Sequence, residues 1–491
     1  MTVEQLNTML LFGAVVLLVS IAAVRLSVGT GLPSLLLYLA LGLILGEDAL
    51  GLDFDNDELA QALGYAALVV ILAEGGLTTS WRTIRPVVPA AAALATIGTA
   101  VSVVVTAGAA QWLLDVDWRY AFLVGAVLAP TDSAAVFSVL RRVPLPPRIA
   151  GLLEAESGFN DAPVVILVVA LAGASAPTWY ELIGLLAYEL TAGAIVGLAV
   201  GALGALAVRR IALPASGLYP LAVMALCVTA YGAAAVAHAS GFLAVYLAAV
   251  VLGNSRLPHR PATRGFAEGM AWLAQIGLFV MLGLLATPSD LGSSILPALG
   301  IGLVLLLVAR PLSVTASTLL FRVPWRDQAF LAWAGLRGGV PVVLSTVPRD
   351  EEIFNIVFVL VVVYTIVQGP TLPWVARRLG LLQTGEAQEL DIESSPLTRL
   401  DAELLQVHVP EGSRLAGVEV FELRLPRGAA ITLVVRDGEA FVPSPTTKLR
   451  VGDELIVVTT GDVRDEVDRR LRAVARSGRL AGWYRERGRP G

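Results

Sequence analysis

The stretch LLEAESGFNDAPVV, residues 152–165, places three carboxylates inside a long apolar segment. A charged side chain at the centre of a bilayer costs roughly 2.5–3.5 kcal/mol on insertion scales, so such groups usually have partners and functions. Glu156 and Asp161 are five residues apart and point about 140° apart on an ideal helix. Asp161 can therefore face a cavity while Glu156 faces a partner. Ser157 lies four residues before Asp161 and shares its helix face.

The composition around this stretch is that of a membrane protein. Of the 491 residues, 56% are hydrophobic and 15% are charged, whereas ordinary globular chains carry about 25% charged residues. The single cysteine, Cys227, excludes a disulfide within the chain, and the three widely spaced histidines disfavour a histidine metal cluster. A net charge of −5 disfavours nucleic-acid binding.

Thirteen apolar stretches precede residue 380, and a spanning helix needs about 20 mostly apolar residues. The second and ninth stretches are short. The approximate ranges are 8–26, 32–46, 60–79, 87–114, 118–140, 149–174, 180–207, 216–237, 238–253, 266–287, 294–320, 327–347 and 353–376.

The charges of the loops support this count. If the N-terminus is outside, the cytoplasmic loops hold fifteen arginines and the opposite loops hold two, Arg119 and Arg349. Basic residues concentrate in cytoplasmic loops, so we expect the N-terminus outside and the C-terminus inside. The fifteen are Arg25, Arg82, Arg85, Arg141, Arg142, Arg148, Arg209, Arg210, Arg256, Arg260, Arg264, Arg322, Arg326, Arg377 and Arg378.

A polar C-terminal part follows the apolar one. We expect a transmembrane domain at 1–380, a linker at 381–399, a small α+β domain at 400–476 and a basic tail at 477–491. An Asp-Gly pair in RDGEAF predicts a β-hairpin, and apolar residues at helical spacing follow the last predicted strand. The predicted strands are LLQVHVP (404–410), AAITLVVR (429–436) and ELIVVTT (454–460).

Further charged residues lie inside the predicted spans. Glu74 lies in ILAEGGL and Asp132 in LAPTDSAAVF, and both are candidate functional carboxylates. Glu154 lies near the start of its helix, so we take it as structural, and Arg310 as the anchor of a helix end. Glu268 lies near the start of the tenth span.

Two of the spans carry helix-breaking residues. Pro130 interrupts the fifth span just before Thr131 and Asp132. Gly338, Gly339 and Pro341 do the same in the twelfth span beside Arg337. Two interrupted helices in corresponding halves indicate a transporter site at the midplane of the membrane. Because the two spans are seven apart, they run in opposite directions, as an inverted repeat requires.

The motifs PTDS (130–133) and ESGFND (156–161) resemble the signatures of the cation/proton antiporter superfamily, in its sodium/proton-exchanger branch. The stretches 240–254 and 266–285 resemble bacterial potassium/proton antiporters of the cell-volume-regulation type. VPEGSRLAG and VGDELIVV, within 409–458, resemble the TrkA-C domain, the C-terminal half of the potassium-channel regulator domain.

The resemblance implies a role for each site residue. Asp161 would be the main carboxylate for cation and proton, and Asp132 would support it, so that a monovalent cation lies at these two. Glu156 would pair with an arginine, most simply Arg337. The oxygen shell would include Thr131, Ser157 and Glu74, and the organising residues would be Asn160, Glu156, Arg337, Pro130, Gly338 and Gly339.

The function implied is secondary transport, not enzymatic catalysis. K⁺ or Na⁺ would leave in exchange for one H⁺, by electroneutral alternating access, in pH and volume homeostasis. No cofactor is implied. A homodimer in the plasma membrane and a small nucleotide regulator bound at 400–476 are implied. The alternative is a proton-independent gated potassium channel, which would need a carbonyl filter such as Thr-Val-Gly-Tyr-Gly; the sequence has none.

Overall fold

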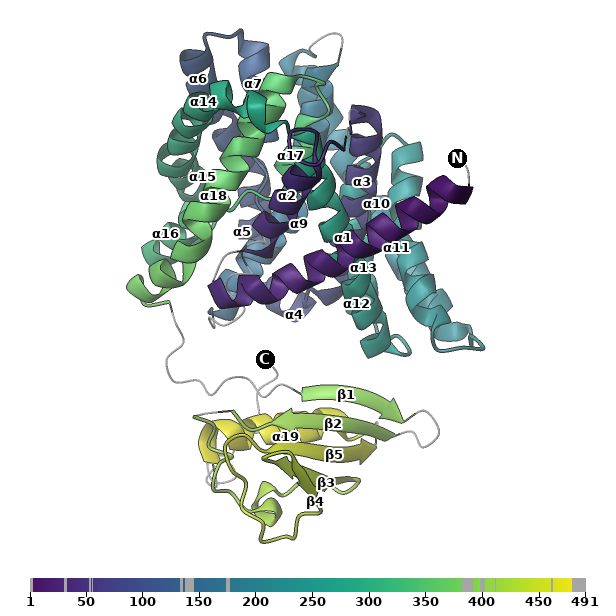
Figure 1. Cartoon of the computed structure of the whole chain (residues 1–491). Helices are drawn as coiled ribbons and strands as arrows, with labels where there is room; N and C mark the ends of the chain where they lie inside the picture. The colour runs from purple at the N-terminus through teal and green to yellow at the C-terminus, as the bar shows by residue number, and fades with distance from the viewer. Residues whose placement is uncertain are drawn as a thin grey trace. The chain divides into compact units, whose positions relative to one another are not determined.

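The computed structural model describes residues 3–30, 33–52, 54, 56–132, 136, 145–173, 177–381, 392–397, 402–410, 412–460 and 462–478. The chain divides into two compact units, Met1–Leu382 and Gln383–Gly491. The first unit is helical and the second combines a sheet with a helix (Figure 1). The basic tail beyond residue 478 and most of the predicted linker lie outside the described residues.

The first unit contains two groups of packed helices. In one group, small residues allow close approach: a Cβ on Gly283 of α13 would lie 2.4 Å from the carbonyl oxygen of Leu39 on α2, and a Cβ on Gly197 of α10 would lie 2.5 Å from that of Ala244 on α12. We call this group the first bundle. Its helices are α1 (Val3–Thr30), α2 (Ser34–Leu45), α3 (Asp57–Thr78), α10 (Trp179–Arg210), α11 (Leu218–Val236), α12 (Gly241–Gly253) and α13 (Arg260–Leu285).

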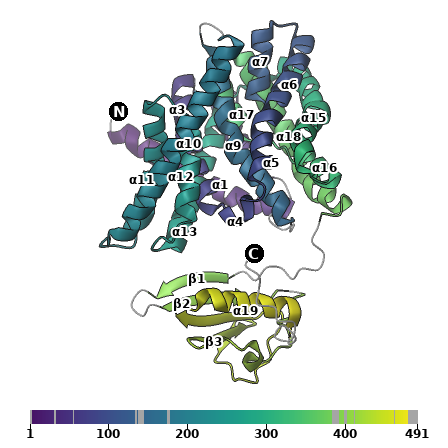
Figure 2. The same ribbon diagram turned by 180° about the vertical axis from the view of Figure 1, so that it is seen from behind.

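The second bundle holds the interrupted segments (Figure 2). Short elements α4 (Trp81–Ile84), η2 (Pro288–Asp290) and η4 (Leu319–Phe321) connect the longer ones. The second bundle comprises α5 (Val88–Ala93), η1 (Leu94–Gly98), α6 (Thr99–Leu114), α7 (Trp118–Val127), α9 (Pro147–Ala172), α14 (Leu291–Val304), η3 (Leu305–Ala309), α15 (Arg310–Thr318), α16 (Trp325–Trp333), α17 (Gly339–Ser345) and α18 (Glu351–Arg378).

Two long segments of the second bundle each contain one π-helical turn, η1 and η3. Pro311 follows η3 and has no N–H to donate, and its ring would clash with the carbonyl four residues earlier in a regular helix. The wider turn relieves that clash. Gly98 at the end of η1 packs on α15, where a Cβ would lie 2.8 Å from Ser317 Oγ and 3.0 Å from Ser313 Oγ.

The two predicted breaks meet in space. Helix α7 ends at Val127, and the chain from 128 to 132 is not helical. Residues 334–338, between α16 and α17, are likewise non-helical. The main-chain N–H of Asp132 donates to the carbonyl of Leu336 at 2.9 Å. This bond joins the two unwound stretches, and we call their meeting point the crossing.

The predicted class, a polytopic helical membrane protein with a small C-terminal α+β domain, is confirmed. Among the described residues, nine helical segments are long and apolar enough to cross a membrane, and α2 and α12 are shorter apolar helices. The interrupted segments account for the rest of the predicted stretches. The number of thirteen crossings stays a prediction.

The second unit is a five-stranded antiparallel sheet in the order β1-β2-β5-β3-β4, with α19 (Arg464–Ser477) packed on it. The predicted Asp437-Gly438 hairpin joins β3 to β4, and both residues have positive φ angles, 52° and 86°. Part of the predicted linker 381–399 forms strand β1, whose main chain pairs with β2 along its whole length. The strands are β1 (Ile392–Leu397), β2 (Ala402–His408), β3 (Ala429–Arg436), β4 (Glu439–Phe441) and β5 (Glu454–Thr460).

Candidate functional site

Helix α9 holds the first unwound stretch through two side chains. Ser157 Oγ donates to the carbonyl of Thr131 at 2.9 Å, and Asn160 Nδ2 donates to Thr131 Oγ1 at 2.8 Å. One residue of the stretch is therefore fixed at both its main chain and its side chain. Pro130, just before it, is buried in the same non-helical stretch.

Each aspartate directly follows one of the residues of this anchor, Asp132 after Thr131 and Asp161 after Asn160. Asp161 is 5% exposed, and its Oδ1 has no hydrogen-bond partner among the described residues. Asp132 is half-buried and lies directly against Gly338, where a Cβ would come within 1.7 Å of Asp132 Oδ2. Glycine at 338 therefore makes room for the carboxylate, and the second half of the chain forms part of its surroundings.

A cavity of about 440 Å³ lies between the two bundles and contains both aspartates. Side chains of α2, α3, α12 and α13 form one wall, and α9, α17 and the stretch before Asp132 form the other. No lysine, arginine or histidine lines it among the described residues. Five carboxylates line it, namely Glu74, Asp132, Glu154, Asp161 and Glu268.

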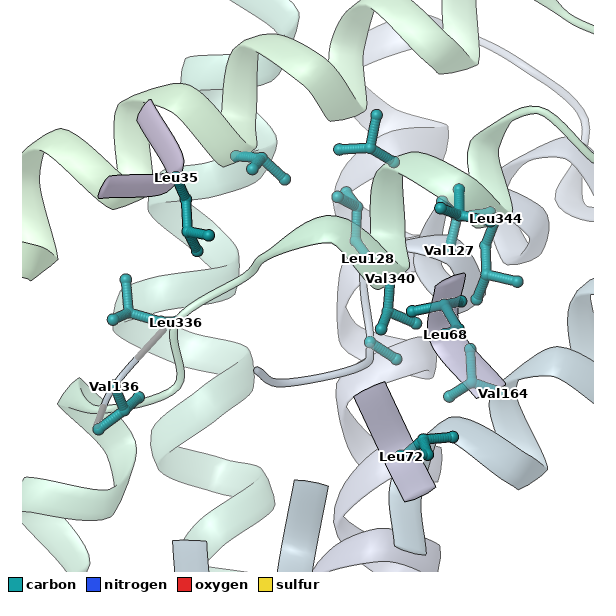
Figure 3. Close-up of a cluster of buried hydrophobic side chains, with 14 of the residues drawn as sticks. Leu35, Leu68, Leu72, Val127, Leu128, Val136, Val164, Leu336, Val340 and Leu344 are labelled. Atoms are coloured by element: carbon teal, nitrogen blue, oxygen red, sulfur yellow. The ribbon is translucent and has the colours of Figure 1, made fainter. Parts of the chain in front are cut away.

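Apolar side chains surround the crossing (Figure 3). Leu128 and Leu336 come from the two unwound stretches, while Val340 and Leu344 come from α17. All four are buried. Electrostatic interactions are stronger in such a low-dielectric environment than in water, so the carboxylates of the cavity interact strongly with any cation or proton that enters.

Glu156 faces away from this cavity and forms an ion pair with Arg310, contrary to the expected pair with Arg337. Arg310 Nη1 and Nη2 donate to the two carboxylate oxygens at 2.6 and 3.0 Å. Both oxygens are thereby engaged in bidentate geometry, the preferred arrangement for this pair. Arg310, expected only as a helix anchor, is 4% exposed. Residue spacing cannot tell which of two buried arginines reaches a given carboxylate.

Arg337 is 1% exposed and lies in the unwound stretch just before Gly338. Its Nε and Nη1 have no hydrogen-bond partner among the described residues. Gly339 begins α17 and packs on α13, where a Cβ would come within 3.0 Å of Leu278. Arg337 and both glycines thus lie at the crossing, although only Gly339 lines the cavity.

Glu154, expected to be structural because it lies near the start of its helix, is one of the five carboxylates that line the cavity. A hydrogen bond joins its Oε1 to the hydroxyl of Thr79, the residue that caps α3. Its spacing of seven residues from Asp161 is two turns of a helix, so both fall on one face. That periodicity was the available signal. Thr79 and Tyr246, which also line the cavity, carried no comparable signal.

The arrangement suits the binding of a hard monovalent cation. Carboxylate, hydroxyl and carbonyl oxygens are the ligands that such ions prefer. Asp161, Asp132, Ser157 and Thr131 offer all three kinds of oxygen within one cavity, and Glu74 lines its opposite wall. Because a carboxylate can bind either a cation or a proton, the same groups can serve both ions.

Comparison with protein families gives two matches. Residues 13–378 match the family described as sodium/hydrogen exchanger, transmembrane, and residues 404–472 match the TrkA-C domain. The solved sodium proton antiporter MjNhaP1 from Methanocaldococcus jannaschii superposes with a TM-score of 0.67, at 21% identity. The superposition covers 76% of this chain and 99% of that one.

Several curated proteins are similar over most of the chain. The K⁺/H⁺ antiporter NhaP of Alkalimonas amylolytica is 36% identical over 471 residues, which are 93% of this chain and 82% of the relative. The K⁺/H⁺ antiporter NhaP2 of Shewanella oneidensis is 35% identical with the same coverage. The Na⁺/H⁺ antiporter ApNhaP of Aphanothece halophytica is 29% identical over 68% of each chain. The chain belongs to the sodium/hydrogen exchanger family of secondary cation/proton antiporters, transporters rather than enzymes, and carries a TrkA-C domain after its membrane domain.

Proposed function

We propose that this antiporter exchanges K⁺ for H⁺ at one site formed by Asp161 and Asp132, with Na⁺ as the second candidate ion. The observation that carries the proposal is a cavity that contains the buried Asp161 and is lined, within the described part of the chain, by five carboxylates and no basic side chain. The choice of K⁺ rests on the relatives named K⁺/H⁺ antiporters, which are similar along both domains.

Competition between the two ions is the coupling mechanism. When a cation binds, Asp161 gives its proton to cavity water, and when the cation leaves, Asp161 takes a proton back. The hydroxyl of Ser157, the carbonyl of Thr131 and the carboxylate of Glu74 would complete the oxygen shell. One proton then replaces one cation, so that each cycle moves no net charge.

Relative movement of the two bundles would expose the site alternately to the two sides of the membrane. The cavity between the bundles supports this mechanism, since it is where such a movement would open or close the path. Asn160, through its bond to Thr131, and Glu156, through its pair with Arg310, would keep the second bundle rigid during the movement.

The membrane orientation follows from the loop charges, with the N-terminus outside and the TrkA-C domain in the cytoplasm. Exposed tryptophans at both ends of the membrane unit support two membrane interfaces. They are Trp112, Trp118 and Trp179 at one end and Trp81, Trp325 and Trp374 at the other. In this orientation the part of the cavity lined by Thr78, Ala150 and Glu268 lies towards the cytoplasm. The TrkA-C domain would regulate transport in a homodimer, through a small nucleotide.

Transport in liposomes tests the proposal. We expect K⁺ to dissipate an imposed proton gradient at clamped voltage, without voltage dependence, and K⁺ to be more effective than Na⁺. Asp161→Asn, which keeps the shape but cannot carry a proton, should abolish exchange while the protein still inserts. Voltage-driven K⁺ flux without proton movement would instead identify a channel. Cation-dependent proton flux in Asp161→Asn would rule out the competing site.

A further inference from the structure

The hydroxyl of Thr79 has one proton, but it is hydrogen-bonded to two oxygen atoms. Its Oγ1 lies 2.7 Å from the carbonyl of Gly75, as a donor, and it is also hydrogen-bonded to Glu154 Oε1. A threonine hydroxyl has one O–H to donate and two lone pairs to accept with. If Glu154 were ionised, it could only accept, and one of the two contacts would join oxygens with no proton between them.

A protonated Glu154 satisfies every contact. Its carboxyl O–H donates to Thr79 Oγ1, and the Thr79 hydroxyl donates to Gly75 O. Thr79 cannot easily turn away, because its side chain is buried and its carbonyl accepts from Asn254 Nδ2 at 2.9 Å. The hydrogen bonds therefore fit a neutral carboxyl at residue 154.

The surroundings of Glu154 also disfavour a negative charge. The cavity presents Glu74 from α3, Glu268 from α13, Asp132 and Asp161, all of which are acids, and Tyr246 from α12. Arg82 of α4, a short helix packed on α9, is exposed to solvent. No cation among the described residues forms a salt bridge with Glu154, while Glu156, two residues later, has Arg310.

We propose that Glu154 is a second proton-carrying carboxyl of the transport path, which holds a proton in this conformation and passes it to Asp161 when the cation leaves. The O–H bond of Glu154 breaks, an O–H bond forms on Asp161, and Glu154 recovers a proton from water at the cavity mouth. The proposal rests on the cation/proton exchange described above, for which it supplies the proton route.

The carboxyl groups of Glu154 and Asp161 are too far apart for direct proton transfer, so the proposed route needs water between them. Seven residues of α9 span about 10 Å, and Ser157 lies between them on the same face. The cavity of about 440 Å³ has room for several waters of about 30 Å³ each. Protons can therefore move along a short chain of water and hydroxyl groups, without movement of the helix.

Two exchange reactions of the same protein in liposomes separate a proton carrier from a structural residue. Cation/proton exchange needs the proton route, whereas exchange of labelled Rb⁺ for K⁺ needs only the cation site. In Glu154→Gln, whose amide can still bond Thr79, we expect cation/proton exchange to fall by about ten- to a hundredfold. Rb⁺/K⁺ exchange and half-saturation by the cation should stay within about twofold.

The controls fix the interpretation. Glu189→Gln removes a half-buried carboxyl of α10 that does not line the cavity, and should leave both reactions unchanged. Equal loss of both reactions in Glu154→Gln, or loss of neither, overturns the proposal. If the wild type exchanges Rb⁺ for K⁺ but shows no cation-dependent proton flux in the cation/proton assay, the proposed function fails for a reason that does not involve Glu154.

A spectroscopic test of the protonated carboxyl does not depend on a transport assay. Infrared spectra of the wild type containing ¹³C-labelled glutamate should show an isotope-shifted band of a protonated carboxyl at neutral pH. Such a band, present in Asp161→Asn and absent in Glu154→Gln, supports the assignment. Absence of the band in the wild type overturns it.

Discussion

Thr131 is the residue through which α9 holds the unwound stretch that precedes Asp132. Its main-chain oxygen accepts from Ser157 and its hydroxyl accepts from Asn160, so α9 fixes the chain immediately before Asp132. Two side chains of one helix, three residues apart, thereby position a residue from another segment. The ESGFND motif keeps these donors at their required spacing, with Asp161 following directly.

Gly338 controls the position of Asp132. In Gly338→Ala the new Cβ would overlap the carboxylate, 1.7 Å from Oδ2 and 2.8 Å from Cβ of Asp132, so this short side chain must move. We expect weaker cation binding, measured as a half-saturation concentration raised by about tenfold or more, with the fold intact. Gly277→Ala on α13, where nothing lies within 4 Å, is the matched control. Unchanged half-saturation in Gly338→Ala would contradict the contact.

The Glu156–Arg310 pair should show strong coupling. Removal of one partner leaves a buried charge alone, which costs about 3–5 kcal/mol, while removal of both is milder. Thermal unfolding in detergent of Glu156→Gln, Arg310→Gln and the double variant measures the coupling. A second double-mutant cycle, with Arg337→Gln in place of Arg310→Gln, should show a smaller coupling energy with Glu156→Gln. The reverse order of the two couplings would restore the expected Arg337 pair.

At the scale of elements, hydropathy predicts where helices lie but not how regular they are. The stretches 87–114 and 294–320 read as continuous apolar helices, and each contains a π turn. The break near Gly338 was predictable because glycine and proline disrupt helices locally. Strand β1 was not, since its pairing with β2 depends on the main chain and not on an apolar pattern.

Close packing of α10 on α12 depends on glycines of α10, among which Gly197 and Gly201 lie against the main chain of α12. In Gly197→Val the added atoms would overlap the Ala244 main chain, whose Cα would lie 2.7 Å from the new Cβ. Overpacking of this kind costs about 1–3 kcal/mol, so the unfolding temperature in detergent should fall. Gly184→Val, on the same helix with open space around it, should change the temperature little. Equal shifts in both would mean that helix propensity, and not packing, is responsible.

For the molecule as a whole, the sequence was sufficient to predict the membrane class, the two breaks and three acidic residues that the structure places in the cavity, because charges and helix breakers stand out in apolar spans. It was not sufficient for the partner of Glu156, nor for the part of Glu154 in the cavity. Both depend on which helices pack together. Contacts between segments far apart in the chain have no local signature.

The stability of the TrkA-C unit should depend on pH through Asp453. Burial alone would raise the pKa of this carboxyl, but the hydrogen bonds from Arg436 and from the Arg450 N–H outweigh it and lower the pKa. The unfolded chain, with a pKa near 3.9, then binds the proton more tightly. This stabilisation is therefore present above about pH 4 and is lost as the pH falls through the folded value.

Hydrogen exchange of the full chain in detergent measures the effect. Amides of β3 and β5, corrected for their intrinsic rates, should lose protection as the pH falls below about 4. Asp453→Asn should remove most of this pH dependence. Asp468→Asn, which breaks a half-exposed pair with Arg472, is the control and should leave the pH dependence unchanged. Identical pH profiles for the wild type and Asp453→Asn would exclude this carboxyl as the source.

The hydrogen bond from Asp132 N–H to Leu336 O joins the first half of the membrane domain to the second. The first half contributes both aspartates, but the main chain that holds one of them, and the glycine that admits its carboxylate, belong to the second half. Neither half alone could form the proposed ion site. The two halves are complementary, and residues 336–338 tolerate little change because the position of Asp132, far earlier in the chain, depends on them.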